Sequence, residues 1–364
     1  MPIHRHALNR MPRFPFDKFT DASNVLSTQM KATGEVMGVG RTFEESILKS
    51  IRSLEDNKNH IHMEKFDREN MSTEELLSYV KEGRDDRIYA VAQLMWMGAD
   101  HSQLCNATQI DLFFLDKIKK IVDFEKELEA TKPDNGVISE ENIELLKEAK
   151  KRGFSDAYIA ELWDMKEDQV YELRKKNHIF PVYKMIDTCA SEFDSYVPYF
   201  YSTYEEENES VVSDREKIVV LGSGPIRIGQ GVEFDYSTVH AVRTIQEAGY
   251  EAIVINNNPE TVSTDYTTAD KLYFEPLTVE DVMNVLELEK PKGVIVSLGG
   301  QTAINLAKPL AQKGVPIIGT GCEAIDNAED RDLFETMIQK TGIPHPMGIA
   351  VTDIESGVED TCSP

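Results

Sequence analysis

The stretch KIVVLGSGPIRIGQGVEFDYSTVHAVRTIQEAGYEAIVIN, residues 217–256, decides the fold. An apolar strand at 218–221 runs into a turn with glycines at Gly222, 224, 229 and 231. A helical segment follows, and a second apolar strand occupies 252–255. This order predicts a βαβ unit, whose first turn places backbone N–H groups and a helix N-terminus where an anion can sit.

The same alternation continues toward the C-terminus. Further strands are expected at 293–297 and 315–318, and helices at 236–248, 279–288, 302–312 and 331–341. Apolar strands separated by helices predict a doubly wound parallel α/β sheet. The loops at Gly222, Asn256 and Gly299 then lie at the carboxyl ends of strands, where ligands gather in such sheets.

The glycine turn differs from both common phosphate-binding loops. No Gly-Lys-Ser/Thr triplet ends it, so it is not the loop of a nucleoside triphosphatase. Its spacing is GxGxxxxG, and the second strand closes on Asn256–Asn258 instead of the acidic residue that holds a ribose. A nicotinamide-dependent dehydrogenase remains an alternative, and this strand end argues against it.

Residues 57–208 are predicted to be helical. Ser72-x-x-Glu75 is a capping box, and Ser139 caps a later helix. Asn142 stands where a box needs an acid or glutamine, so this second cap is expected to lack its reciprocal half. A further helix, expected at 110–128, places apolar residues inward; they are Leu112, Leu115, Ile118, Ile121 and Val122.

An earlier helix is expected at 42–54. Thr42-x-x-Glu45 is a capping box at its start, and Phe43, Ile47 and Ile51 predict one buried stripe.

Two short helices at 155–163 and 166–176, joined by a turn, are also typical of a DNA-binding helix-turn-helix. Arg174, Lys175 and Lys176 would supply its charge. The net charge of −25 argues against binding nucleic acid or an anionic membrane surface.

Composition favours a reduced, soluble protein of the cytoplasm. The 364 residues are 41% hydrophobic and 28% charged, which allows two or three packed domains. The four cysteines lie far apart, without zinc spacing, so neither a disulfide framework nor a metal site is expected. No membrane span or signal peptide is visible. Residues 1–16 contain three arginines and no acidic residue, and they are interpreted as an irregular start.

Three motifs closely resemble the synthetase (large) subunit of carbamoyl phosphate synthetase. They are RIGQGVEFDY at 227–236, NPETVSTD at 258–265 and GGQT at 299–302. They match the domain just ahead of the second ATP-grasp unit of that family. The segment 11–41 resembles the closing stretch of the first ATP-grasp unit, so the likeness runs from about Met11 to Glu359.

The resemblance implies a Rossmann-like pre-ATP-grasp domain following an all-α oligomerisation domain. Residues 1–56 would end the first ATP-grasp half, 57–208 would form the oligomerisation domain and linker, 209–342 the pre-ATP-grasp domain, and 343–364 the start of the second ATP-grasp. Thr352-x-x-Glu355 opens a helix close to the last residue. The chain is therefore interpreted as an internal portion of the large subunit.

The family makes carbamoyl phosphate from bicarbonate, glutamine-derived ammonia and two ATP, for arginine and pyrimidine biosynthesis. The resemblance implies ATP and Mg²⁺ (or Mn²⁺) as cofactors of the complete enzyme, a glutaminase small subunit as partner, and homo-oligomerisation through the helical domain. The family's metal-holding residues lie on ATP-grasp strands before residue 11 and beyond residue 364. No metal site, catalytic site or standalone activity is therefore expected here. The competing hypothesis is a non-catalytic oligomerisation or interaction module.

By the same resemblance, one set of residues lines the internal carbamate tunnel or the ligand crevice: Glu35, Arg227, Gly231, Glu233, Glu260, Gln301 and Thr302. Arg331 matches an arginine that approaches nucleotide phosphates.

Each of these residues also has a local interpretation. Glu233 can cap its helix, and Glu260 can brace the Asn-Pro-Glu turn. Arg331 can form a surface ion pair, and Thr302 can cap a helix. Arg227 can hold an anion or brace Asp235, and the sequence leaves both open.

Overall fold

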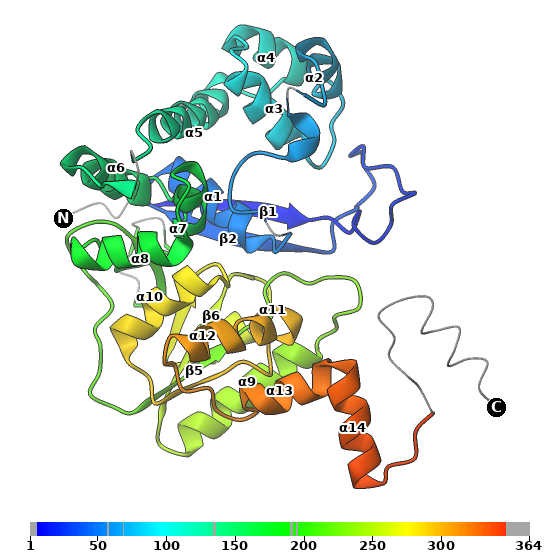
Figure 1. The fold of residues 1–364 in the computed structure, drawn as a ribbon, viewed down its shortest axis with the longest axis vertical. Helices are drawn as coiled ribbons and strands as arrows, with labels where there is room; N and C mark the ends of the chain where they lie inside the picture. The colour runs from blue at the N-terminus through cyan, green and yellow to red at the C-terminus, as the bar shows by residue number, and fades with distance from the viewer. Residues whose placement is uncertain are drawn as a thin grey trace.

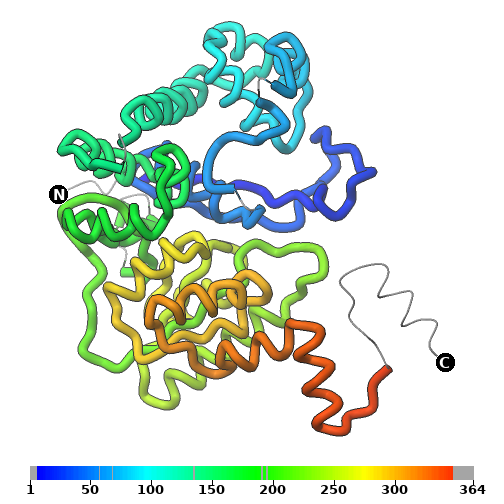
Figure 2. The backbone as a smooth tube through the Cα atoms, in the orientation of Figure 1, coloured from blue at the N-terminus to red at the C-terminus, as the bar shows by residue number. Residues whose placement is uncertain are grey.

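The computed structural model describes residues 6–346, apart from 57, 68, 134–135, 190–191 and 194–195. Figure 1 shows helices α2–α5 gathered at one end of the molecule, a sheet with its covering helices at the other, and the β1–β2 hairpin between them. The cap expected at Thr352 lies outside the described residues. Helix α14 projects from the body of the sheet domain (Figure 2).

The sheet has six strands in the order β3-β4-β7-β6-β5-β8. Their bounds are β3 Val182–Met185, β4 Tyr199–Thr203, β5 Lys217–Leu221, β6 Glu251–Asn256, β7 Lys271–Phe274 and β8 Gly293–Ile295. Strand β3 runs antiparallel to β4, and the other pairings are parallel. The doubly wound α/β prediction is confirmed.

Four segments of this sheet differ from the strand predictions. The segments that form β3 and β4 were interpreted as linker, and β7 was not predicted. The strand expected at 315–318 is reduced to a single bridge between Val294 and Ile317. The missed strands, VYKM, YFYST and KLYF, contain polar residues and lack the continuous apolar run that marked the predicted strands.

The helices of this domain are α9 Glu233–Glu247, α10 Val279–Glu289, α11 Gly300–Asn305, α12 Ala307–Gln312, α13 Cys322–Glu329 and α14 Arg331–Thr341. The single helix expected at 302–312 is two helices that meet at Leu306. Pro309 has no N–H to donate to the carbonyl of Asn305, and this interrupts the ladder where α11 ends.

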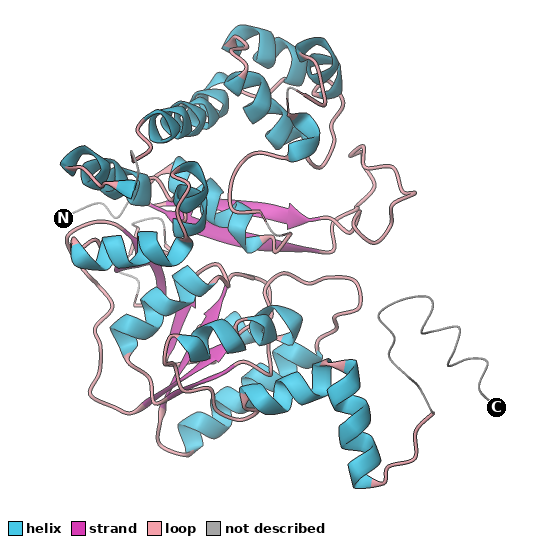
Figure 3. Ribbon diagram, viewed as in Figure 1, coloured by secondary structure: helices cyan, strands magenta, loops and turns pink. Residues whose placement is uncertain are grey.

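Helices lie on both faces of the sheet (Figure 3), and apolar side chains on both faces are buried. Val219, Leu221 and Ile253 face a core with α10, α11 and α12. Val220 and Val254 face the opposite core, to which α9 and the β2 strand contribute. Continuous apolar strands are the expected consequence, because neither face meets water.

The helical domain contains α2 Thr73–Tyr79, α3 Arg87–Trp96, α4 His101–Thr108, α5 Leu112–Ala130, α6 Glu140–Lys151, α7 Asp156–Leu162 and α8 Glu167–Lys176, with a 3₁₀ turn at Glu64–Phe66. The Ser72 capping box is confirmed.

Two predictions about these helices were wrong. The Ser139 cap is a complete box, because the amide oxygen of Asn142 accepts the Ser139 N–H at 2.9 Å. Leu112 is 53% exposed instead of inward, since it lies in the first turn of α5, while Leu115 and Ile118 are buried.

Residues Ala7–Arg13 form strand β1, which pairs antiparallel with β2 Gly34–Gly40, and this corrects the irregular start over those residues. Helix α1, Phe43–Ser53, is buried on almost every side instead of along one stripe. Thr42 caps it, but the carboxylate of Glu45 accepts from the Arg41 N–H at 2.6 Å, so no reciprocal box forms.

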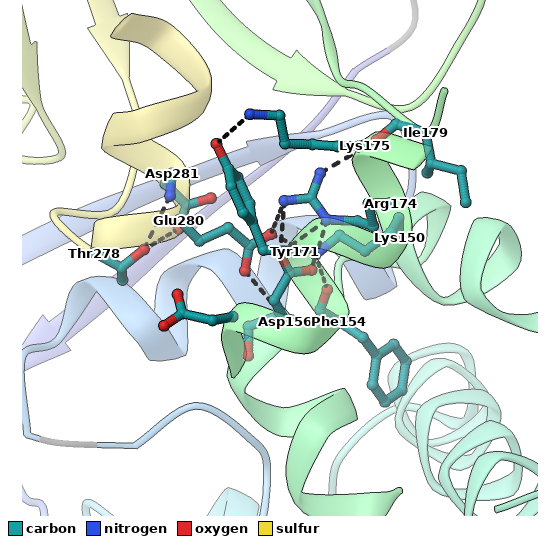
Figure 4. Close-up of polar contacts among 12 residues, drawn as sticks. Lys150, Phe154, Asp156, Tyr171, Arg174, Lys175, Ile179, Thr278, Glu280 and Asp281 are labelled. Carbon is teal, nitrogen blue, oxygen red and sulfur yellow. Dashed lines mark hydrogen bonds and ion pairs between the residues drawn. The ribbon is translucent and has the colours of Figure 1, made fainter. Parts of the chain in front are cut away.

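Buried charges join the helical domain to the sheet domain (Figure 4). Glu280, in the first turn of α10, pairs with Lys150 of α6 and accepts the Asp156 N–H at 2.6 Å. Arg174 of α8 donates to both carboxylate oxygens of Asp156. The Arg174 side chain is 1% exposed, so it is not available to DNA as a helix-turn-helix would require.

Glu280→Gln should lower the free energy of unfolding by about 3 kcal/mol, because it leaves buried Lys150 and Arg174 short of negative charge. Urea unfolding at pH 7 measures the change. Glu287→Gln on the same helix is the control; its partly exposed pair with Lys175 should be worth less than about 1 kcal/mol.

The dependence of the unfolding free energy on acidic pH gives an independent check on Glu280. Burial alone would raise its pKa, but the charges of Lys150, Arg174 and Arg52 outweigh burial and hold the pKa at about 2. A depressed carboxyl pKa stabilises the fold above the unfolded value of about 4.3 and ceases to do so as the pH falls toward 2. Between about pH 4.3 and 2, Glu280→Gln should therefore lose less unfolding free energy than the parent. Equal losses would contradict a low pKa for Glu280.

Candidate functional site

Three loops meet at the carboxyl ends of β5, β6 and β8, as the sequence predicted. A Cβ added at Gly222 would lie 2.4 Å from the Asn256 side chain, and one added at Gly299 would lie 2.3 Å from the Gly222 carbonyl oxygen. Glycine is required at both positions because the loops are in direct contact. The crevice is therefore lined mainly by side chains from neighbouring segments.

The asparagines that end β6 bind the glycine turn itself. Asn256 Oδ1 accepts the Gly224 N–H at 3.1 Å, and Asn258 Nδ2 donates to the Gly224 carbonyl at 3.2 Å. Gly224 has a φ of +68°, which side-chain-bearing residues rarely adopt. Its N–H is already satisfied, so the turn is held by amides and not shaped around a pyrophosphate.

Glu35 and Glu260 come together around Arg10. The Arg10 guanidinium lies 3.0 Å from Glu35 on the neighbouring strand β2 and 3.4 Å from Glu260, which is 250 residues away in sequence. The Glu35 side chain is 24% exposed, whereas that of Glu260 is 61% exposed. Two of the predicted residues thus share one cation, and Glu260 does not brace its own turn with its carboxylate.

Burial raises the pKa of Glu35, Arg10 opposes this rise, and the negative charge of Glu260 adds to it. The pKa of Glu35 therefore depends on both of its charged neighbours.

Glu233 and Gly231 lie at the start of α9, on the exposed side of the turn. The Gly231 N–H donates to the Glu233 carboxylate at 3.0 Å, and this bond lowers the Glu233 pKa. A Cβ on Gly231 would meet the same carboxylate. The two residues are adjacent as predicted, and the helix-start interpretation of Glu233 describes its observed contact.

Arg227 and Thr302 meet on the carboxylate of Glu55. Arg227 pairs with Glu55 and donates to Thr302 Oγ1, and Thr302 Oγ1 donates to Glu55 Oε2 at 2.6 Å. Arg227 therefore holds an anion and does not brace Asp235, whose carboxylate accepts the N–H groups of the Val262–Ser263 turn. Thr302 does not cap α11, which begins at Gly300.

Gln301 and Arg331 lie apart from these two clusters. Gln301 donates to Asn305 at 2.9 Å and to Glu329 at 3.0 Å. Arg331 begins α14 and is exposed, with no ion pair among the described residues. Glu329, two residues before Arg331, is the residue that contacts Gln301.

Sequence reasoning missed Arg10 and Glu55, which organise the two clusters. Arg10 falls in the segment interpreted as irregular, because the residues ALNRMPR do not alternate in polarity and the strand is defined by its pairing with β2. Glu55 follows the end of α1 with a φ of +56°, and nothing in its local sequence marks it. Within the described part of the chain, no three His, Cys, Asp or Glu side chains are grouped to hold a metal.

Two sequence profiles match this chain. Residues 35–178 match the oligomerisation domain of the carbamoyl-phosphate synthetase large chain, and residues 214–327 match the carbamoyl phosphate synthase preATP-grasp domain. Together they cover well over half of the sequence. The chain belongs to the carbamoyl phosphate synthetase large-chain family. The recognised family and its two domains thus agree with the fold, and the family is one of ATP-dependent ligase-type enzymes.

A solved structure, the biotin carboxylase domain of a single-chain bacterial carboxylase, is 16% identical over 39% of this chain and 33% of that chain, with a TM-score of 0.29. This chain thus spans a third of that protein's length. Among the described residues no helix is both long and apolar enough to traverse a bilayer.

Substitutions at Arg10 and Glu260 should move the Glu35 pKa in opposite directions. Arg10→Met removes the cation and should raise it further, while Glu260→Gln removes a like charge and should lower it. Carboxyl ¹³C NMR titration of Glu35 measures both. A Glu35 pKa unchanged by either substitution would mean that the three side chains do not meet in solution.

Proposed function

We propose that this chain contributes the tunnel-bearing centre of a carbamoyl phosphate synthetase, between the step that makes carbamate and the step that phosphorylates it. The reaction uses bicarbonate, glutamine-derived ammonia and two Mg-ATP, and serves arginine and pyrimidine biosynthesis in the cytoplasm. The nucleotide-gripping strands and a glutaminase small subunit are supplied by other parts of the enzyme. By itself the chain would not complete the reaction.

The observation that carries this proposal is the Arg10–Glu35–Glu260 cluster. It joins the end of the first-half segment to the pre-ATP-grasp domain through side chains that remain partly exposed. A water-labile anion passing such a point needs fixed polar groups in place of free solvent. Arg10 can attract the anion, while the two carboxylates prevent it from binding too tightly to leave.

The other predicted residues would act at different points along the same path. Arg227 and Thr302 would hold an anionic group near the glycine turn, where they already hold a carboxylate. Glu233, with Gly231 beside it, and Gln301 would line the crevice. Arg331 would meet nucleotide phosphates, a role favoured by its exposure and its freedom from ion pairs among the described residues.

The second candidate is a non-catalytic oligomerisation or interaction module. The match of 35–178 to an oligomerisation domain favours self-association in either case. The exposed aromatic pair Phe113 and Phe114 at the start of α5 offers an apolar surface on that domain. The two candidates differ in whether the site residues affect carbamoyl phosphate output.

A chimera tests this difference. In the chimera, residues 1–364 of this chain replace the corresponding segment of an active synthetase large subunit, with and without the substitution Glu260→Gln. If Glu260 guides the intermediate, the variant should make carbamoyl phosphate about tenfold more slowly while bicarbonate-dependent ADP release continues, so more than two ADP form per product.

Glu287→Gln in the same chimera is the control and should keep the parent ratio. Equal ratios in parent and Glu260→Gln chimeras, or an active chain without the rest of the synthetase, would contradict the proposal and favour the interaction module or an independent enzyme.

A further inference from the structure

A cavity of about 1100 Å³ lies beside the glycine turn. Its walls come from the segment after β1, from the helical domain and from the turn around Arg227. Phe14 and Phe16 line it, with their rings stacked at a centroid distance of 5.7 Å. The cavity is therefore large enough for a small molecule and has an apolar wall on which a ring can rest.

The charge lining this cavity is opposite in sign to that of the chain as a whole. Seven lysines and arginines line it against five aspartates and glutamates, although the chain carries a net charge of −25. A small positive excess suits a ligand with one negative charge. A doubly charged phosphate would also meet the cavity's carboxylates at close range, which costs energy in a partly buried space.

The glycine turn already holds one carboxylate, and it belongs to the chain itself. Glu55 lies against Gly224, where a Cβ would be 2.0 Å from Glu55 Oε1, and its other oxygen accepts from Thr302 at 2.6 Å and pairs with Arg227. Glu55 reaches this position with a φ of +56°, a strained value for a residue with a side chain. The turn is thus an anion site with an intramolecular occupant.

Several polar atoms on the cavity walls are buried without hydrogen-bond partners among the described residues. They are Glu55 Oε1, Arg227 Nε, Arg13 Nε and the hydroxyl of Tyr89. The side chain of Glu55 is 9% exposed, and Tyr89 is 5% exposed. Buried donors such as the two Nε–H groups and the Tyr89 hydroxyl are costly unless an acceptor reaches them, and an anionic ligand can be that acceptor.

The two arginines reinforce this preference for an anion. Burial and the positive charge of Arg13 both act to lower the pKa of Arg227, and the negative charge of Asp17 acts against them. A ligand carboxylate between the two guanidiniums would relieve their repulsion and use both free Nε–H groups.

We propose that this cavity binds a small monocarboxylate with an apolar or aromatic body, whose carboxylate displaces that of Glu55 from Arg227 and Thr302. Glu55 is then an internal competitor that occupies the site when the ligand is absent. Because Glu55 follows the last residue of α1 and its C-cap, it can leave without unwinding the helix, and leaving relieves its backbone strain. This inference is independent of the proposed tunnel role of Glu35 and Glu260.

Calorimetric titration of the full chain with benzoate tests the proposal, with benzamide as the uncharged analogue. Glu55→Gln should bind benzoate at least tenfold more tightly than the parent, because the competing charge is gone. Arg227→Gln should bind at least tenfold more weakly. Arg152→Gln, which removes an equal charge from a pair with Glu148 on α6, should leave binding unchanged.

Two further measurements make every outcome decisive. Urea unfolding establishes that each variant folds. If Arg227→Gln does not fold, Thr302→Val takes its place as the variant expected to bind benzoate more weakly. Phenyl phosphate should bind more weakly than benzoate, since the site suits one charge. Equal binding of benzamide and benzoate, or a Glu55→Gln affinity no higher than that of the parent, would overturn the proposal.

Discussion

The buried carboxylate of Glu280 is the contact on which the arrangement of the whole chain depends. It belongs to the first turn of a sheet-domain helix, yet its partners are Lys150 and the backbone of Asp156 in the helical domain. Lys150 and Arg174 supply the compensating positive charge. A charge so deeply buried is tolerated only with its partners in place, so the contact specifies one orientation of the two domains.

Helix α1 and the β1–β2 hairpin extend this constraint across the interface. Lys49 donates to the Ser202 carbonyl at 2.6 Å and lies 3.5 Å from Glu275, while Arg52 reaches Asp281. The Met37 N–H of β2 donates to the Asn257 carbonyl at 2.9 Å, immediately beside the glycine turn. Arg10 and Glu35 are thereby set against Glu260, and Glu55 against Gly224. Both clusters are products of domain orientation and not of any one motif.

The sequence predicted those parts of the fold that are written locally. The apolar runs that became β5 and β6, the glycine turn, and helix α14 at 331–341 could all be read from pattern and spacing. Strands β3, β4 and β7 could not, because they are short and exist through pairing with neighbours. Pro309 divided one expected helix into two, and Asn142 completed a capping box that an acid was expected to close.

The site was predictable only in part, for the same physical reason. Motif resemblance selected Glu35, Glu260, Arg227 and Thr302, and each lies in one of the two observed clusters. Their contacts depend on Arg10 and Glu55, whose partners are between about 25 and 250 residues away and leave no local signal. Arg331 and Gln301 lie outside both clusters.

Differential scanning calorimetry of the full chain tests the central claim, that buried charges make the two domains one cooperative unit. The account predicts a single transition whose calorimetric and van't Hoff enthalpies agree. Two separate transitions, or a calorimetric enthalpy well above the van't Hoff value, would show that the domains unfold independently and would contradict it.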